Sequence, residues 1–257
     1  MMSRPASSLA VDLSGRTALI TGASSGLGER FGRLLAESGA RVALGARRTD
    51  RLEAIASQIG ESAAAVRMDV AREADIIAGY DAAEAALGGV VDTVIANAGV
   101  DGAGIAVEIS EEEIERTLAI NLKGAILTAR EGARRMMAAG ITRGRIVLVA
   151  SITAFEPSPG LVAYSASKAG VVQAARSMAR EWARSGICVN TISPGYIFTD
   201  INAAWFKTEA GERQIARFPR KRLMAAEGLD GPLLFLCSDA SEYVTGADFV
   251  LDDGQTL

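Results

Sequence analysis

The sequence has 257 residues, a formal net charge of -4, two cysteines and no histidine. Without histidine the chain has neither a Ser-His-Asp nor a Cys-His catalytic set, and it offers no histidine ligand to zinc. Two cysteines are too few for a four-thiolate zinc site, so we expect no metal site, and proton transfer falls to Tyr, Lys, Asp, Glu or Cys.

Apolar runs and helical periodicities alternate along the whole chain. We expect strands at residues 16–21, 41–46, 65–70, 90–96, 145–150, 187–192 and 247–251. We expect helices at residues 27–37, 51–59, 73–87, 111–139, 163–184 and 225–236. The first helix illustrates the periodicity, because Leu27, Phe31 and Leu34 fall on one of its faces.

The expected strands are mostly continuous apolar runs. Such strands are buried on both faces, which is typical of a parallel sheet covered by helices. No Pro/Gly/Ser-rich linker divides the chain, so we predict one doubly wound α/β domain over residues 1–257, with about seven parallel strands, helices on both faces and an N-terminal tail at 1–12. The long irregular stretch at 194–222 is predicted to be a substrate-binding flap.

A glycine-rich turn joins the first expected strand to the first expected helix. It reads Thr21-Gly22-Ala23-Ser24-Ser25-Gly26-Leu27-Gly28. Glycines at such a turn let the backbone approach a pyrophosphate, and the helix N-terminus adds free N–H groups and the positive end of its dipole. A glycine turn can be purely structural, but its place between a first strand and a helix favours nucleotide binding.

Five further motifs follow in order along the expected strands and helices: Asn97-Ala98-Gly99, Asn121, Ser151, Tyr164-x-x-x-Lys168 and Pro194-Gly195. Together with T-G-x-x-x-G-x-G, this series resembles the classical short-chain dehydrogenase/reductase family over nearly the whole chain. The resemblance implies a single-domain Rossmann fold. It also implies an oxidoreductase that transfers hydride between a nicotinamide cofactor and a ketone or secondary alcohol.

The resemblance assigns roles to four residues. Tyr164 is expected to be the general acid/base, Ser151 to bind the substrate oxygen, and Lys168 to lower the pKa of Tyr164 and hold the nicotinamide ribose. Asn121 is expected to hold a water molecule in a proton relay, although an asparagine there can also simply pin a helix. The expected cofactor contacts are Gly22, Ser24, Ser25, Gly26, Leu27, Gly28, Arg47, Arg48, Asp69, Val70, Asn97, Ala98, Gly99, Tyr164, Lys168, Pro194, Gly195, Ile197 and Thr199.

Tyr164 and Lys168 are four residues apart, so they share a helix face. A free tyrosine has a pKa near 10 and is a poor base at pH 7. An adjacent ammonium group, or the positive ring of an oxidised nicotinamide, favours the phenolate. Lowering the pKa to near 7 requires about 4 kcal/mol, which one close cation supplies at an effective dielectric near 20.

The end of the second expected strand determines the cofactor prediction. Ala46 occupies the slot where NAD-binding relatives have an acidic residue, and Arg47 and Arg48 follow at once. Guanidinium groups favour a ribose 2′-phosphate, so we predict NADP(H), with NAD(H) possible. The alternative is a solvated arginine pair at a helix entry, and Ser25 stands where many NADP-dependent relatives have a basic residue. Asp69 resembles the family's adenine-contact position, with a helix N-cap as its alternative.

The substrate is expected to be a small to medium, largely apolar ketone or alcohol. The expected substrate contacts are Ser151, Phe155, Tyr164, Tyr196 and Trp205. These aromatic residues, with Phe198, Ile201 and Phe206, fit a pocket wall and a packed flap equally well. One alternative is a 3-oxoacyl thioester reductase acting on acyl carrier protein or coenzyme A. Its carrier would be attracted by Arg217, Arg220, Lys221 and Arg222, unless these residues form a solvated face. A third hypothesis is a non-catalytic nucleotide-binding regulatory protein.

Cys188 and Cys237 form no C-x-x-C motif, so we expect buried reduced thiols and a cytoplasmic protein. The first ten residues have no signal-peptide core, and no apolar run reaches the roughly 18 residues that span a membrane. The pI of about 5.1 argues against nucleic acid as a partner. The resemblance implies a homo-oligomer, usually a tetramer and alternatively a dimer, with the helices at 111–139 and 163–184 pairing across an interface.

Overall fold

The computed structural model describes residues 11–198 and 203–257. Within these ranges seven parallel strands form one sheet in the order β3-β2-β1-β4-β5-β6-β7. The strands are β1 (Thr17–Thr21), β2 (Arg41–Ala46), β3 (Ala63–Arg67), β4 (Thr93–Ala96), β5 (Arg145–Val149), β6 (Cys188–Pro194) and β7 (Asp248–Leu251). The predicted seven-stranded parallel sheet is confirmed.

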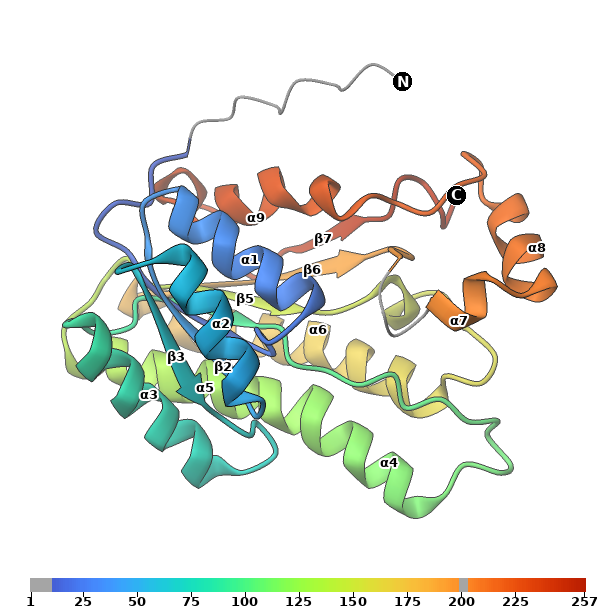
Figure 1. Ribbon diagram of the computed structural model, residues 1–257, viewed down its shortest axis with the longest axis horizontal. Helices are drawn as coiled ribbons and strands as arrows, with labels where there is room; N and C mark the ends of the chain where they lie inside the picture. The colour runs from blue at the N-terminus through green and yellow to red at the C-terminus, as the bar shows by residue number, and fades with distance from the viewer. Residues whose placement is uncertain (1–10, 199–202) are drawn as a thin grey trace.

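Helices cover both faces of this sheet, as predicted (Figure 1). The α-helices are α1 (Gly26–Glu37), α2 (Thr49–Ile59), α3 (Glu73–Leu87), α4 (Glu111–Leu118), α5 (Gly124–Ala138), α6 (Val162–Trp182), α7 (Ala203–Phe206), α8 (Glu209–Arg217) and α9 (Asp230–Cys237). Short irregular helices are η1 (Ala119–Lys123), η2 (Ile152–Ala154), η3 (Ala183–Ser185), η4 (Ala226–Leu229) and η5 (Asp239–Ser241). In the described part of the chain, no helix has the length and apolar character to cross a membrane.

Two apolar cores lie on opposite faces of the sheet. Helices α1, α2 and α9 contribute to one core, and α3, α5 and α6 contribute to the other. Leu19 and Ile20, neighbours in β1, belong to different cores because successive side chains of a strand point to opposite faces. The strands therefore read as continuous apolar runs because both of their faces are covered.

The chain changes direction across the sheet between β1 and β4. It first builds outward from β1 to β2 and β3, and then returns to place β4 on the other side of β1. In doubly wound sheets such a switch point opens a crevice at the carboxyl ends of the strands. The glycine turn after β1 and the Asn97-Ala98-Gly99 segment after β4 lie at this crevice.

The helix expected at 111–139 is present from Glu111 to Ala138, but it contains a π-helical segment that was not expected. Helix α4 ends at Leu118, and the π-helical segment η1 separates it from α5. The side chain of Asn121, in the middle of η1, bonds to both the backbone N–H and the carbonyl of Val100. Tertiary contacts of this kind override a continuous helical periodicity, and π-turns are frequent at functional sites.

Several other boundaries differ from the prediction: β4 begins at Thr93 rather than at residue 90, for example, and β6 ends at Pro194. Strand β3 ends at Arg67, so Asp69 and Val70 lie in the turn that leads to α3. The helix expected at 225–236 is divided into η4 and α9. Pro232 lies in the first turn of α9, where its missing N–H costs no helical hydrogen bond.

The flap at 194–222 contains α7 and α8 rather than a bare loop. The Tyr196 ring packs edge-on to Phe206, with centroids 5.7 Å apart, and stacks on Phe218 at 5.8 Å. Phe206 and Phe218 are buried, so this aromatic cluster packs the start of the flap against α7 and against the segment after α8. Phe198 is exposed, and Ile201 lies outside the described residues.

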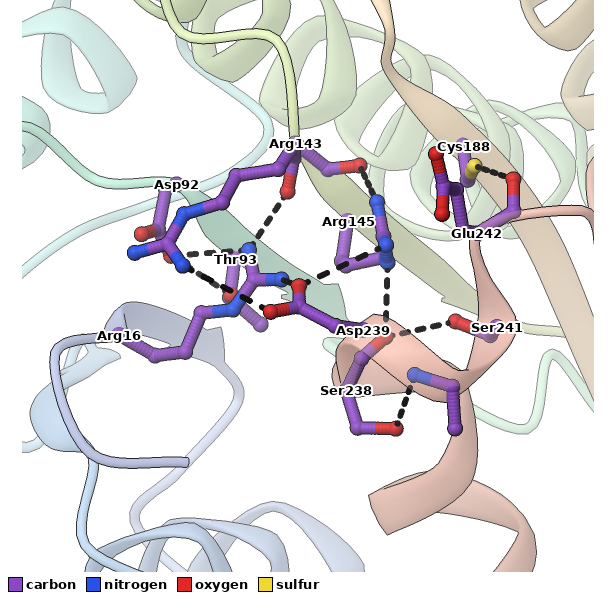
Figure 2. A network of polar contacts seen from close by, with 12 residues as sticks. Arg16, Asp92, Thr93, Arg143, Arg145, Cys188, Ser238, Asp239, Ser241 and Glu242 are labelled. Carbon is purple, nitrogen blue, oxygen red and sulfur yellow. Dashed lines mark hydrogen bonds and ion pairs between the residues drawn. The ribbon is translucent and has the colours of Figure 1, made fainter. Parts of the chain in front are cut away.

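A polar network joins the amino-terminal ends of three strands (Figure 2). The crevice lies at the opposite, carboxyl-terminal ends of the strands. Arg16 and Arg145 are both buried and both pair with Asp239, which follows α9. Arg16 also donates to the Arg143 carbonyl at 2.6 Å and lies 3.8 Å from Asp92. These contacts link β1, β4, β5 and the end of α9, so the network holds the sheet together away from the crevice.

The two cysteines are free and buried, as predicted. Cys188 begins β6 and Cys237 ends α9. Burial raises the pKa of Cys237 to about 12, so this thiol stays protonated at neutral pH.

Candidate active site

One cavity of about 940 Å³ follows the carboxyl ends of the strands at the switch point. Its wall includes Gly22 after β1, Asn97 after β4, Ser151 after β5 and Gly195 after β6. This volume is near the upper end of the range for ligand pockets, and the position is the one expected for a doubly wound sheet.

The structure brings most of the predicted site residues to this single cavity. Its wall contains Gly22, Ser24, Ser25, Gly26, Leu27, Gly28, Arg47, Arg48, Asp69, Val70, Asn97, Ala98, Gly99, Ser151, Tyr164, Lys168, Pro194, Gly195, Tyr196, Ile197 and Trp205. Asn121 lies just behind the wall, and Thr199 is outside the described residues. Phe155 is half exposed and lies away from the cavity wall, because η2 turns it outward to solvent.

The glycine turn fits a pyrophosphate. A Cβ on Gly28 would lie 2.4 Å from the Gly22 carbonyl oxygen, so only glycine allows α1 to start this close to β1. Gly26 has a φ of +57°, and a Cβ there would meet no atom within 4 Å, so the turn is open toward the cavity. Ser25 is the N-cap of α1, but its hydroxyl does not cap the helix. The first N–H groups of α1 are therefore available to an anion.

Arginines lie at this end of the cavity. The Arg48 guanidinium donates to the hydroxyl of Ser24 at 2.8 and 3.1 Å, and to that of Ser25 at 2.9 Å. Arg47 and Arg51 also line the cavity, and none of the three arginines forms an ion pair with residues 11–198 or 203–257. Arg51 was missed in the sequence, although its position three residues after Arg48 places both on one helix face.

The Asn97-Ala98-Gly99 segment joins β4 to β1 and to the lysine. Asn97 donates from its amide to the Thr21 carbonyl at 3.0 Å, and the backbone N–H groups of Asn97 and Ala98 donate to the Thr21 hydroxyl at 3.1 Å. A Cβ on Gly99 would lie 3.7 Å from Lys168 Nζ. The segment therefore forms a wall of backbone beside the ammonium group.

Asp69 lies at the turn before α3 and lines the cavity. Its carboxylate accepts a hydrogen bond from the Ala71 N–H at 3.0 Å. The N-cap of α3 is Arg72, so the alternative interpretation of Asp69 as a helix N-cap is wrong. The Asp69 carboxylate instead closes a local turn that presents Val70 to the cavity.

Ser151, Tyr164 and Lys168 meet at the other end of the cavity. Ser151 is buried, and its Oγ accepts hydrogen bonds from the N–H of Thr153 at 3.2 Å and from its hydroxyl at 3.1 Å. With both of these bonds accepted, the Ser151 proton is free to point toward Tyr164 or a substrate oxygen. Lys168 Nζ lies 5.5 Å from the centroid of the Tyr164 ring.

Burial dominates the ionisation of the tyrosine and the lysine. It raises the pKa of Tyr164, and the hydrogen bond with Ser151 opposes this effect. It also lowers the pKa of Lys168 to about 8. Lys168 Nζ donates to the Val149 carbonyl at 2.7 Å. The expected lowering of the Tyr164 pKa is therefore not seen, because desolvation of the phenol outweighs the influence of its neighbours.

Asn121 is buried and fully engaged with the protein. Its Oδ1 accepts from the Val100 N–H at 2.8 Å, and its Nδ2 donates to the Val100 carbonyl at 2.9 Å and to Ser167 Oγ at 3.2 Å. These contacts tie η1 to the segment after β4 and to the helix that carries Tyr164. Pinning of the backbone, the alternative interpretation of this residue, therefore accounts for three of its hydrogen bonds.

The remaining wall, beyond Tyr164, is formed by the flap and by two loops. The hydroxyls of Ser158 and Tyr196 lie 3.3 Å apart, and the Trp205 indole donates to Gln214 at 2.8 Å. Ser158, Gln214 and Asp101 were missed in the sequence, where no motif marks them. They come from three segments that only the fold brings together.

The basic run beyond the flap is partly neutralised. Arg220 and Arg222 both pair with Asp253, at 2.9 and 2.7 Å. Arg217 and Lys221 are exposed and lie away from the cavity wall. The run therefore holds the flap to the C-terminal segment, which weakens the argument for an acyl-carrier surface.

Comparison with known proteins agrees with this geometry. A family model described as short chain dehydrogenase matches residues 16–210. D-threitol dehydrogenase of Mycolicibacterium smegmatis is 37% identical over 248 residues, covering 95% of this chain and 94% of the relative. Cis-4-hydroxycyclohexanecarboxylate dehydrogenase of Sinomonas cyclohexanicum is 37% identical over 244 residues, covering 94% and 96%.

A solved structure agrees over the same length. The gluconate 5-dehydrogenase from Burkholderia cenocepacia, in complex with NADP and tartrate, has a TM-score of 0.90 at 31% identity and covers 96% of this chain and 97% of its own. The family model covers strands β1 to β6 and the Ser151, Tyr164 and Lys168 cluster, and the relatives extend over nearly the whole chain. The chain belongs to the short-chain dehydrogenase family of oxidoreductases, which act on alcohols.

Proposed function

We propose that the protein is an NADP(H)-dependent dehydrogenase that interconverts a secondary alcohol and a ketone, with Tyr164 as general acid/base. One observation carries this proposal. One cavity has arginines that form no ion pair within the described residues beside a glycine turn at one end, and the Ser151, Tyr164 and Lys168 cluster at the other. An extended phosphorylated dinucleotide needs this arrangement, with the arginines at its phosphate end and the cluster at the end where its reactive ring meets the substrate.

The preference for NADP(H) over NAD(H) rests on Arg48. Ser24 and Ser25 hold its guanidinium over the glycine turn. A positive charge therefore lies at the position of Ser25, where many NADP-dependent relatives have a basic residue. Ala46, at the end of β2, offers no carboxylate to a ribose 2′-hydroxyl. Two solved relatives are described with bound NADP, which supports the same choice.

Ser151, Tyr164 and Lys168 each have a separate role in proton transfer. A bound nicotinamide supplies the hydride acceptor or donor. The Ser151 hydroxyl is free to donate to the substrate oxygen, because Thr153 already fills the acceptor sites of Ser151 Oγ. Tyr164 then takes the alcohol proton in oxidation and returns it in reduction. Lys168 keeps a positive charge beside the phenolate that accepts the proton in oxidation and that reduction leaves behind.

The Tyr164→Phe variant tests this mechanism. The variant should bind NADPH like the wild type, because the ring and its packing remain. Its turnover of a good alcohol or ketone should fall by about 10²-fold or more. Cofactor fluorescence measures binding and NADPH absorbance measures turnover, on a panel of alcohols and ketones repeated with NADH. Unchanged turnover would refute the assignment of Tyr164.

We also infer a homo-oligomer. An apolar groove runs along α4, η1 and α5, formed by Leu118, Ala119, Leu122, Ile126 and Leu127 and flanked by charged residues. Grooves of this kind on an exposed helix face mark association surfaces. Light scattering coupled to size-exclusion chromatography measures the mass, and replacing Leu122 with Glu should lower it. A monomeric wild type would refute the inference.

A further inference from the structure

We propose that Asp101 is a specificity-determining residue that admits uncharged hydroxylated substrates and rejects those carrying a carboxylate. The proposal rests on the dehydrogenase function proposed above and names the substrate class of that same cavity. The observation behind it is the charge of the cavity wall beyond Tyr164.

Asp101 lies close to the reacting groups. Its side chain lines the cavity, and its charge contributes to raising the pKa of Tyr164. The other residues on this side of the cavity are apolar or uncharged: Ala103, Gly104, Ile105, Ser158, Pro159, Gly160, Leu161, Tyr196, Trp205, Phe206 and Gln214. Among the described residues on this side, Asp101 therefore sets the charge that a substrate meets.

The Asp101 charge is not neutralised by the protein. No arginine or lysine in residues 11–198 and 203–257 forms an ion pair with it. Arg116, whose pKa the charge of Asp101 helps to raise, is already bound to both carboxylate oxygens of Glu113, at 2.6 and 2.9 Å. Lys168 donates to the Val149 carbonyl instead. A substrate carboxylate in this space would meet a like charge without a compensating cation.

The backbone on both sides of Asp101 is fixed. Val100 is held by two hydrogen bonds to the Asn121 amide, at 2.8 and 2.9 Å. Gly102 has a φ of +56°, and a Cβ there would lie 2.4 Å from the Thr117 hydroxyl. Gly104 donates to the Gly160 carbonyl at 2.8 Å, which ties the loop to the segment before α6. The carboxylate is therefore presented to the cavity on a supported turn.

Two hydroxyl groups on the same side of the cavity complete the preference. Ser158 and Tyr196 present two hydroxyls 3.3 Å apart, which can both donate to and accept from a polyol. The Asp101 carboxylate accepts hydrogen bonds only, so it suits substrate hydroxyls and opposes substrate carboxylates. A neutral polyol or a hydroxylated amide can form hydrogen bonds with the carboxylate and with both hydroxyls.

Two substrates of the same size test the proposal: cis-4-hydroxycyclohexanecarboxylate and its primary amide, which differ in charge. The wild type should show at least a tenfold higher kcat/KM for the amide. In Asp101→Asn this preference should fall about tenfold through faster use of the acid, and Asp101→Ser should behave alike. In 1 M salt the preference of the wild type should weaken, while that of Asp101→Asn should not.

Glu108→Gln is the matched control, because Glu108 is an exposed carboxylate on the same loop that lies away from the cavity wall. This variant should keep the wild-type preference. Equal use of acid and amide by the wild type, or an unchanged preference in both Asp101 variants with normal NADPH binding, would overturn the proposal. Failure of the proposed function differs visibly, since neither substrate, nor any alcohol of the panel, would then be turned over by the wild type.

Discussion

Replacing Lys168 with methionine should stabilise the protein at pH 7 while impairing catalysis. The lysine is almost fully buried, at 4% exposure, and its Nζ donates a hydrogen bond to the Val149 carbonyl at 2.7 Å. Burial of a charged amine without a carboxylate partner costs free energy, and methionine has a similar length without the charge. Lys168 thus holds a position that favours activity over stability.

The magnitude follows from the pKa. Burial lowers the pKa of Lys168 from 10.5 to about 8, and this difference is equivalent to about 3 kcal/mol of unfolding free energy. Losing the hydrogen bond to Val149 costs about 1 kcal/mol. The variant should therefore be about 2 kcal/mol more stable than the wild type at pH 7.

The sign of the pH dependence is fixed by the direction of the shift. Between pH 8 and 10.5 the unfolded chain binds more protons at this lysine than the folded chain, so wild-type stability from this group rises with pH. At pH 10 the burial cost falls below about 1 kcal/mol. The advantage of Lys168→Met should then disappear.

Urea denaturation of the wild type and Lys168→Met at pH 7, 8.5 and 10 measures the difference. Taking the difference at each pH removes the titration of all groups shared by both proteins. Lys123→Met is the control, because Lys123 is exposed in η1. A Lys168→Met variant that is less stable than the wild type at pH 7, or a difference independent of pH, would refute the reasoning.

Three further predictions concern the cofactor end and the tyrosine. Arg48→Ala should raise the KM for NADPH about tenfold or more and leave the KM for NADH within about twofold, because the variant loses a charge-assisted contact to the proposed 2′-phosphate. Initial rates with both cofactors measure the two KM values. Gly28→Ala should abolish cofactor binding and lower the melting temperature, since its Cβ would meet the Gly22 backbone, whereas Gly231→Ala, in open space, should do neither. The rate of alcohol oxidation should rise with pH through an ionisation between about 6 and 8, and the residual rate of Tyr164→Phe should lack it.

The fold was predictable because the sequence repeats one physical pattern. The apolar run of β1, the glycine turn and the periodicity of α1 establish a strand-turn-helix unit that recurs along the chain. The π-helical segment η1 was not predictable, because the residues of 119–123 keep a helical periodicity. Its cause is a contact between Asn121 and Val100, which no local pattern reveals.

The site likewise contains residues that the sequence identifies and residues that only the fold reveals. Tyr164 and Lys168 are identifiable from spacing, since both lie on one helix. Asp101 carries no motif, and its importance depends on a supported turn and on the absence of a basic partner in the described part of the chain. Arg48 was found by position, but its bond to Ser25, which places a guanidinium at the glycine turn, could not be predicted from the sequence.

The absence of histidine and the burial of Lys168 are connected. Composition excludes histidine, and Tyr164 and Lys168 are the proton-transfer pair proposed above, but tyrosine and lysine both have ordinary pKa values near 10, far from neutral pH. Burial moves them in opposite directions, lowering the pKa of Lys168 to about 8 and raising that of Tyr164. The lysine thus becomes the residue of the pair that titrates nearest to neutral pH. Phenolate formation then depends on positive charge that arrives with the cofactor, which couples the reactivity of the tyrosine to cofactor binding.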